Sequence, residues 1–372
     1  MDLSGGFNAN ERYTKFTSTY ITNLTIPGFY NLSNTSQPPT SDNTTTLRRL
    51  YGVFGIANFS FDNWLYASVT ARNDWSSTLP KDNNSFFYPA VTLSAVLSDL
   101  LELDQSTFSL IKVRASYAQA GNDAPPYRVN PVYTAGDARA GGFGSIKFPI
   151  GGINAFEVGD LLGNERLQPE ITTELEFGAD IRLFRERVNI DVAYYDRTTT
   201  DQIIQVPLDP ASGFTDQTTN LGEVENKGVE LLVGLVPVRT PDFSWDLSFN
   251  YNKNENNVVS LGETDQTQLV LNSAYNIEMR AEAGKPLGAI YAPASARTPD
   301  GSIIVNPSTG LPQDADDLEY RGSINPDFMM GFGTGLSYKN FRLSANADYR
   351  KGGVMFSYTA RLNYFVGNAW NT

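Results

Sequence analysis

The sequence predicts an all-β fold: an antiparallel transmembrane β-barrel, present in part and equal to about half of a 22-stranded barrel. Three observations predict it. Apolar and polar residues alternate with a period of two in many segments, the connections between these segments are short and long in turn, and aromatic residues stand beside the short ones. This combination is typical of strands that show one face to lipid and the other to a polar interior.

The alternation is clearest in residues 171–183, where odd positions such as Phe177 are mostly apolar and even positions include Glu174 and Glu176. After a turn at 184–187 the pattern resumes, which predicts a hairpin. A strand needs ~9–11 residues to cross a bilayer at a tilt. By these rules we expect about ten strands. Two are the strands of this hairpin, 171–183 and 188–195, and the others are 51–61, 64–72, 89–97, 110–119, 229–235, 244–252, 328–338 and 341–350. A further candidate strand spans 8–20.

The lengths of the connections also alternate. The short ones are 61–64, 184–187, 237–242 and 338–341, and a looser linker spans 98–108. The long ones are rich in Gly, Pro, Asn and Asp and span 72–86, 119–169, 198–226 and 254–326. Outer-membrane barrels alternate periplasmic turns and extracellular loops in this way, whereas a soluble β-sandwich has no reason to do so. The short turns are flanked by a predicted interfacial belt of Phe61, Trp64, Phe184, Phe243, Trp245, Tyr338 and Phe341.

Composition removes several classes of function. A formal net charge of −13 argues against a nucleic-acid partner. The chain has no His and no Cys, which excludes Ser-His-Asp, Cys-His and HExxH arrangements as well as disulfides and thiolate metal sites. Mean hydropathy is −0.30, and no run of eighteen apolar residues predicts a spanning helix. We expect no enzymatic activity, no cofactor and no metal.

Three patterns have a chemical interpretation, and in each case a structural one is favoured. Glu174 and Glu176 could act as paired carboxylates, but a barrel interior is polar in any case. Residues 331–335 (GFGTG) resemble a phosphate loop, but no predicted helix follows, so a strand with small inward positions is expected. The acidic run at 314–319 lacks the spacing of an EF-hand and predicts a solvated loop.

The long connections carry aromatic and amide side chains that suit a glycan, because sugar rings stack on aromatic faces and amides bond hydroxyl groups. Packing between loops and contact with a partner explain the same residues equally well. Asp300-Gly301 predicts a hairpin turn within one of these connections. The candidate ligand contacts are Trp75, Tyr127, Tyr133, Asn154, Phe156, Tyr275 and Tyr291.

Five stretches, in order along the chain, carry recognisable motifs. They are RNDWSS within 47–80, FFYPAVTL with IKVRASYAQAGND in 86–123, NERLQPE at the start of 164–203, Asn220, Gly222, Asn226, Gly228 and Glu230 in the spacing N-x-G-x-x-x-N-x-G-x-E, and INPDF through YRKGG in 324–353. Together these stretches resemble the SusC/RagA family of TonB-linked outer-membrane proteins of Bacteroidetes. The order of the motifs makes the resemblance more specific than any one of them.

The resemblance implies that residues 1–372 are the C-terminal part of a TonB-dependent receptor barrel. A plug domain and a TonB box are then expected upstream of Met1, and a final strand after Thr372. The first residues, MDLSGGFNANERYTKF, lack the basic start and apolar core of a secretory signal, which agrees with a natural polypeptide that begins upstream.

The resemblance further implies a place in the bacterial outer membrane, in contact with lipid. The implied activity is TonB-dependent import of an oligosaccharide or a peptide, with a SusD-like surface lipoprotein as lid and TonB as the source of force. Two alternatives stay open: a siderophore- or cobalamin-type receptor, and a soluble all-β glycan-binding or adhesin module. A β-sheet glycoside hydrolase is a third, and it would depend on Glu174 and Glu176.

Overall fold

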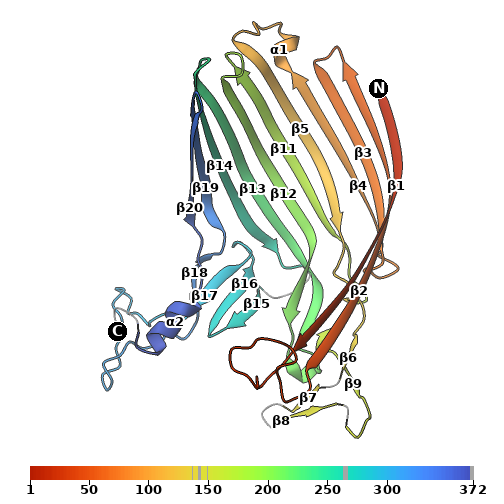
Figure 1. Cartoon of the computed structure of the whole chain (residues 1–372), viewed down its shortest axis with the longest axis vertical. Helices are drawn as coiled ribbons and strands as arrows, with labels where there is room; N and C mark the ends of the chain where they lie inside the picture. Colours follow the sequence, from red (N-terminus) through yellow and green to blue (C-terminus); the bar gives the residue numbers. More distant parts are fainter. Residues whose placement is uncertain (136, 141–143, 149, 263–266, 369–372) are drawn as a thin grey trace.

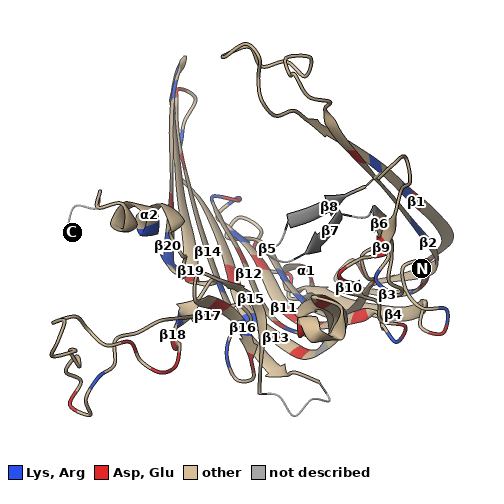
Figure 2. Ribbon diagram, turned by 90° about the horizontal axis from the view of Figure 1, so that it is seen from below, with Lys and Arg blue, Asp and Glu red and all other residues tan. Residues whose placement is uncertain are grey.

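The computed structural model describes residues 1–135, 137–140, 144–148, 150–262 and 267–368. Its main feature is one large antiparallel sheet whose strands follow each other in the order β1-β2-β3-β4-β5-β11-β12-β13-β14-β19-β20, with β10 paired in parallel to β13. Seen from below in Figure 2, the sheet is bent into an open trough, with β1 and β2 in one arm and β19 and β20 in the other. β1 and β20 form its two edges.

The strands of this sheet are β1 (Asp2–Tyr20), β2 (Thr40–Phe61), β3 (Leu65–Ser76), β4 (Ser85–Val96), β5 (Phe108–Asn122), β10 (Leu161–Leu162), β11 (Glu170–Leu183), β12 (Val188–Pro207), β13 (Asp216–Arg239), β14 (Phe243–Ser260), β19 (Pro326–Tyr338) and β20 (Phe341–Gly352). All ten expected strands and the further candidate near the N-terminus are confirmed as members.

Smaller elements lie in the connections. A four-stranded sheet, which we call the loop sheet, contains β15 (Gln268–Ala274), β16 (Ile277–Glu282), β17 (Ala289–Ala292) and β18 (Glu319–Ser323). The connection between β5 and β11, which we call the 5–11 connection, contains two strand pairs, β6 (Tyr133–Ala135) with β9 (Phe156–Val158) and β7 (Asp137–Ala140) with β8 (Gly144–Lys147). The helical segments are α1 (Leu97–Leu100), the 3-10 turn Pro210–Ser212 and α2 (Tyr358–Phe365). Among the described residues, no helix has the length and apolar character needed to cross a membrane.

The alternation of short and long connections is confirmed. The short turns 62–64, 184–187, 240–242 and 339–340 lie together at one end of the sheet with α1, at the top of Figure 1. The loop sheet and the hairpins of the 5–11 connection lie toward the other end. We call these the short-turn end and the long-loop end. The predicted aromatic belt therefore lies at the short-turn end of the sheet, where Phe61 and Trp64 meet edge to face with ring centroids 6.0 Å apart.

The strands are longer than expected. Those on the main path contain 12 to 24 residues, and β13 is the longest. The predicted connection 198–226 is largely strand, because β12 continues to Pro207 and β13 begins at Asp216. Only the part of a strand that lies inside the bilayer needs apolar residues. Beyond it the backbone hydrogen bonds between strands continue through Thr, Asn and Gln residues, whose hydropathy shows no alternation.

The apolar face of the sheet is uncovered. Phe177 is half exposed, and Leu343 is 67% exposed, although both lie in regular strands. No second sheet packs on this face within the described residues, so the soluble β-sandwich alternative is wrong. The apolar band ends toward the long-loop end at ion pairs on the same face, Glu11 with Arg49 at 2.7 Å and Asp196 with Lys227 at 3.4 Å.

Candidate functional site

The opposite, inward face of the sheet is polar and closely paired. Arg114 on β5 bonds Glu176 on β11 at 3.1 Å and Asp191 on β12 at 3.2 Å. Arg197 pairs with Glu174 one step further toward the long-loop end. Neighbouring strands place these residues side by side because their register aligns the even positions of β11 with the odd positions of β12.

Amides continue this face toward the long-loop end. The Asn226 Oδ1 atom accepts from the Asn254 Nδ2 at 3.1 Å and from the Asn256 Nδ2 at 2.9 Å. The Tyr195 hydroxyl donates to Asn254 Oδ1 at 3.2 Å, and Asn252 donates to Glu230 at 3.1 Å. These residues form a strip across β12, β13 and β14 that consists mainly of amides and includes one carboxylate, which we call the amide strip.

The amide strip leads into a cavity of about 620 Å³ between the loop sheet and the ends of β14, β19 and β20, which we call the rim niche. Its walls offer amide, hydroxyl, carboxylate and aromatic groups from Asn254, Asn256, Tyr320, Ser323, Asn325 and Asp327. Gly322, Gly352 and Gly353 bring backbone to its surface, all three with positive φ. Lys253 and Glu255 also line the niche and pair with each other at 2.6 Å, so the groups left to meet a ligand are mostly amides and hydroxyls, which suit a polar ligand such as a peptide backbone.

An apolar cluster joins the loop sheet to the wall, and a cation–aromatic group stabilises the loop sheet itself. Val224 and Val258 of the wall pack with Ala281 and Leu261 in a buried cluster. Within the loop sheet, Lys285 lies 4.6 Å from the Tyr320 ring centroid. The Tyr320 ring is therefore supported on one side and 41% exposed, at the edge of the rim niche.

Behind Tyr320, Tyr291 is buried at 6% exposure beneath the Arg280 guanidinium, whose Cζ lies 4.1 Å from the ring centroid. Its hydroxyl accepts from Lys285 Nζ at 2.8 Å and donates to Glu282. Burial, together with the Glu282 carboxylate, raises the pKa of the Tyr291 phenol. The structure therefore makes Tyr291 an internal support, although the sequence pattern presents it as a loop aromatic.

A second buried group ties the 5–11 connection to the sheet, and we call it the loop anchor: Arg48, Ser76, Thr78 and Asp123. Arg48 donates to both Asp123 oxygens at 2.6 and 2.8 Å, Thr78 donates at 2.9 Å, and Ser76 donates as well. Burial alone would raise the pKa of Asp123, but these hydrogen bonds outweigh it and hold the pKa below its usual range. Leu79, Phe86, Ala124 and Leu167 cluster beside the anchor.

The expected loop aromatics do not form one site. Trp75 lies inside β3, opposite Tyr51 on the outward face, so its predicted place in a loop is wrong. Tyr127 is in the 5–11 connection, where its hydroxyl accepts from the Leu47 amide at 3.1 Å. Tyr275 occupies the β15–β16 turn with φ of 55° and stacks on Tyr358 of α2 at 5.1 Å.

Three of the candidates do lie in one region. Tyr133 on β6 and Phe156 on β9 fall on the same face of their two-stranded hairpin, two register positions apart. Both are at least 70% exposed, and Asn154 lies two residues before Phe156 and is exposed. The residues of the rim niche were not predicted, because Asn254 and Asn256 fall at the start of the predicted connection 254–326, and Tyr320 is a single aromatic beside an acidic stretch.

The structural interpretations of the chemical patterns hold. Glu174 and Glu176 are bound to different arginines rather than to each other. Residues 331–335 lie within β19. In the acidic run, Asp314, Asp316 and Asp317 are exposed and lie in the connection before β18, as expected for a solvated loop. The turn at Asp300-Gly301 is confirmed, with the Thr298 amide donating to the Ser302 carbonyl at 2.9 Å.

A bent antiparallel sheet with an apolar outer face, a belt of aromatics at the short-turn end and a charged inner face defines the wall of an outer-membrane β-barrel. The chain belongs to the TonB dependent receptor-like β-barrel family, whose model matches residues 2–372. Membership confirms the expected place in the bacterial outer membrane, and it confirms that the chain belongs with receptors rather than enzymes.

Curated relatives include TonB-dependent receptor P3 of Formosa agariphila, 29% identical over 87% of this chain and 34% of the relative. TonB-dependent receptor SusC of Bacteroides thetaiotaomicron is 27% identical over 86% of this chain and 32% of the relative. The chain thus spans about a third of the length of these relatives. A solved structure of the RagAB peptide importer has a TM-score of 0.71 at 21% identity, covering 94% of this chain and 39% of that chain. The SusC/RagA-like character of the chain is confirmed.

Proposed function

We propose that the chain forms barrel wall and extracellular loops of a TonB-dependent channel that imports an oligosaccharide or a peptide. In this proposal residues 1–372 are the C-terminal part of the barrel, a SusD-like surface lipoprotein covers the long-loop end, and TonB supplies the force for release inward. The observation that carries it is the polar inward face, which contains the amide strip that leads into the rim niche and the Arg114 ion pairs.

The chemistry of the niche favours a neutral polar ligand. Asn254, Asn256 and Asn325 offer both donors and acceptors, and the exposed ring of Tyr320 offers a stacking face. A sugar or a peptide backbone satisfies such groups, whereas a compact ferric chelate of high charge would leave the amides unpaired. The RagAB peptide importer, which shares this fold, supports the peptide as one of the two ligand classes.

The test is calorimetry on the intact receptor with its lipoprotein, using a neutral oligosaccharide series, a mixed peptide series and a ferric siderophore as three separate arms. Tyr320→Ala should weaken binding of the true ligand class about tenfold, and Tyr320→Phe should keep most of it, since stacking needs only the ring. Tyr30→Ala, at an 88% exposed tyrosine of the 21–39 connection, is the matched control. Binding of the siderophore alone, or equal losses in Tyr30→Ala and Tyr320→Ala, would exclude the proposal.

A further inference from the structure

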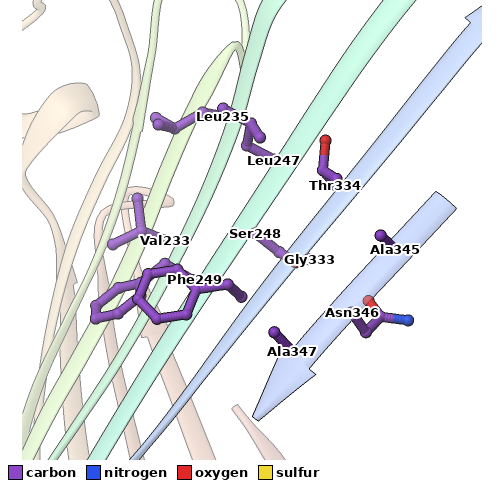
Figure 3. A pocket seen from close by; sticks show the side chains of 11 residues that line it. Val233, Leu235, Leu247, Ser248, Phe249, Gly333, Thr334, Ala345, Asn346 and Ala347 are labelled. Carbon is purple, nitrogen blue, oxygen red and sulfur yellow. The ribbon is translucent and has the colours of Figure 1, made fainter. Parts of the chain in front are cut away.

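The outward face of β13, β14, β19 and β20 contains an apolar hollow of about 350 Å³, drawn in Figure 3, which we call the outer groove. Val233 and Leu235 of β13 and Phe249 of β14 provide its large side chains, and Ala345 and Ala347 of β20 provide small ones. Within the described part of the chain, no charged side chain lines it.

The groove exists because β20 carries small residues, Ala345 and Ala347, in two successive rows of an otherwise bulky surface. Ala345 is paired in register with Thr334, and Ala347 with Phe332. The next row toward the short turn pairs Leu336 with Leu343, and the next row away from it pairs Met330 with Tyr349. The hollow is thus bounded by large side chains at both ends along the strands.

The short-turn end of the groove has the chemistry of a membrane interface. The Trp245 indole nitrogen donates to Thr334 Oγ1 at 3.0 Å, so the Thr334 hydroxyl at the groove has a partner. Beyond it lie Tyr338 and Phe341, and Lys339 Nζ is 5.5 Å from the Tyr338 ring centroid. A cation beside an aromatic belt is complementary to a phosphate of a lipid headgroup.

We propose that the outer groove binds one acyl chain of an anionic phospholipid, with its phosphate beside Lys339. Apolar surfaces gain no hydrophobic energy from each other inside a bilayer, so a retained lipid must be held by van der Waals packing and by its headgroup. The groove supplies the van der Waals packing, and Lys339 supplies the contact to the headgroup. The inference uses the lipid-facing wall alone and does not depend on the proposed import.

The experiment is native mass spectrometry of the intact receptor, stripped of lipid in detergent and titrated with dioleoyl phosphatidylglycerol. Ala345→Leu with Ala347→Leu should fill the groove and weaken retention of the first lipid roughly tenfold, because the acyl chain loses its packing contacts. Lys339→Gln should abolish the preference for phosphatidylglycerol over phosphatidylcholine while leaving the groove open.

Ala179→Leu is the matched control, because Ala179 lies on the outward face of β11 between Val113 and Val192. It should not change retention. If the double variant does not fold, the single variant Ala345→Val replaces it in the same titration. The proposal is overturned if Ala179→Leu and the groove variants have equal effects, if filling the groove leaves retention unchanged, or if it dissociates an oligomer without loss of lipid, which would identify a second copy as the occupant.

Discussion

Asp180 and Asp191 face each other directly across β11 and β12 on the inward face of the wall, and each carboxylate is matched by an arginine. Arg182 lies 3.3 Å from Asp180, and Arg114 reaches Asp191 at 3.2 Å from the far side of β11. Like charges at directly opposed positions oppose strand pairing, so the hairpin depends on these two cations.

Arg114 is the more important of the two, because it also binds Glu176 and so joins β5, β11 and β12. We expect Arg114→Met to lower the free energy of unfolding by about 1 to 2 kcal/mol, a value reduced for the partial exposure of these side chains. Denaturant titration of the receptor in detergent measures it. Adding Asp191→Asn should restore most of the loss, and a double variant no better than Arg114→Met would contradict this account.

The loop anchor makes a pH-dependent contribution to stability. The pKa of Asp123 is lowered in the fold, so its contribution is complete above the unfolded value of about 3.9 and is lost as pH falls through the folded pKa. Asp123→Asn should lose about 1 to 3 kcal/mol of local stability at neutral pH, because buried donors lose a charged acceptor. Hydrogen exchange of residues 124–135 against pH measures both effects.

In the native protein the protection factors of these amides, which are corrected for the intrinsic pH dependence of exchange, should fall below about pH 4, near the unfolded aspartate pKa. In Asp123→Asn they should be low and independent of pH over the same range. Asp300→Asn is a useful control, since the pKa of Asp300 is also lowered, by the Thr298 and Ser302 hydrogen bonds, but in a separate turn. An equal change in residues 124–135 for Asp300→Asn would exclude a local role for Asp123.

The β2–β3 turn gives a prediction about the backbone. Asp62 and Asn63 both have positive φ, at 43° and 59°, as a two-residue turn that follows the twist of its strands requires. Asn63→Gly should be neutral or stabilising by a few tenths of a kcal/mol, whereas Asn63→Val should cost about 1 to 2 kcal/mol, because a β-branched residue disfavours this region. In thermal unfolding, the midpoint of Asn63→Gly should equal or exceed the native midpoint, and the midpoint of Asn63→Val should be lower.

Hydropathy predicted the membrane-spanning parts of the strands because lipid imposes a period of two on them, as at Phe177 and Val192. It did not predict how far β12 and β13 continue. Thr198 pairs with Glu225 and Asn226 pairs with Arg197 through backbone groups, which require no apolar side chains. Hydropathy could not separate Tyr291, which is buried, from Tyr320, which is exposed. Nor could it find the loop anchor, whose members Arg48 and Asp123 are distant in sequence and meet only through strand register.

Leu232 and Val233 test the central assignment of the two faces, because they are adjacent in β13 and point to opposite sides. Val233 lines the outer groove, and Leu232 lies beside Asp180 and Asp191 on the inward face, where it is 59% exposed. A cation on the lipid side of a barrel costs about 2 to 4 kcal/mol near the bilayer midplane, whereas an inward cation stays hydrated. Val233→Arg should therefore lower the free energy of unfolding in lipid bilayers by that amount, and Leu232→Arg should change it by less than about 1 kcal/mol, helped by the two nearby carboxylates. If the two variants exchanged these effects, the face assigned to lipid would be the inner one, and the polar path and the outer groove would both be misplaced.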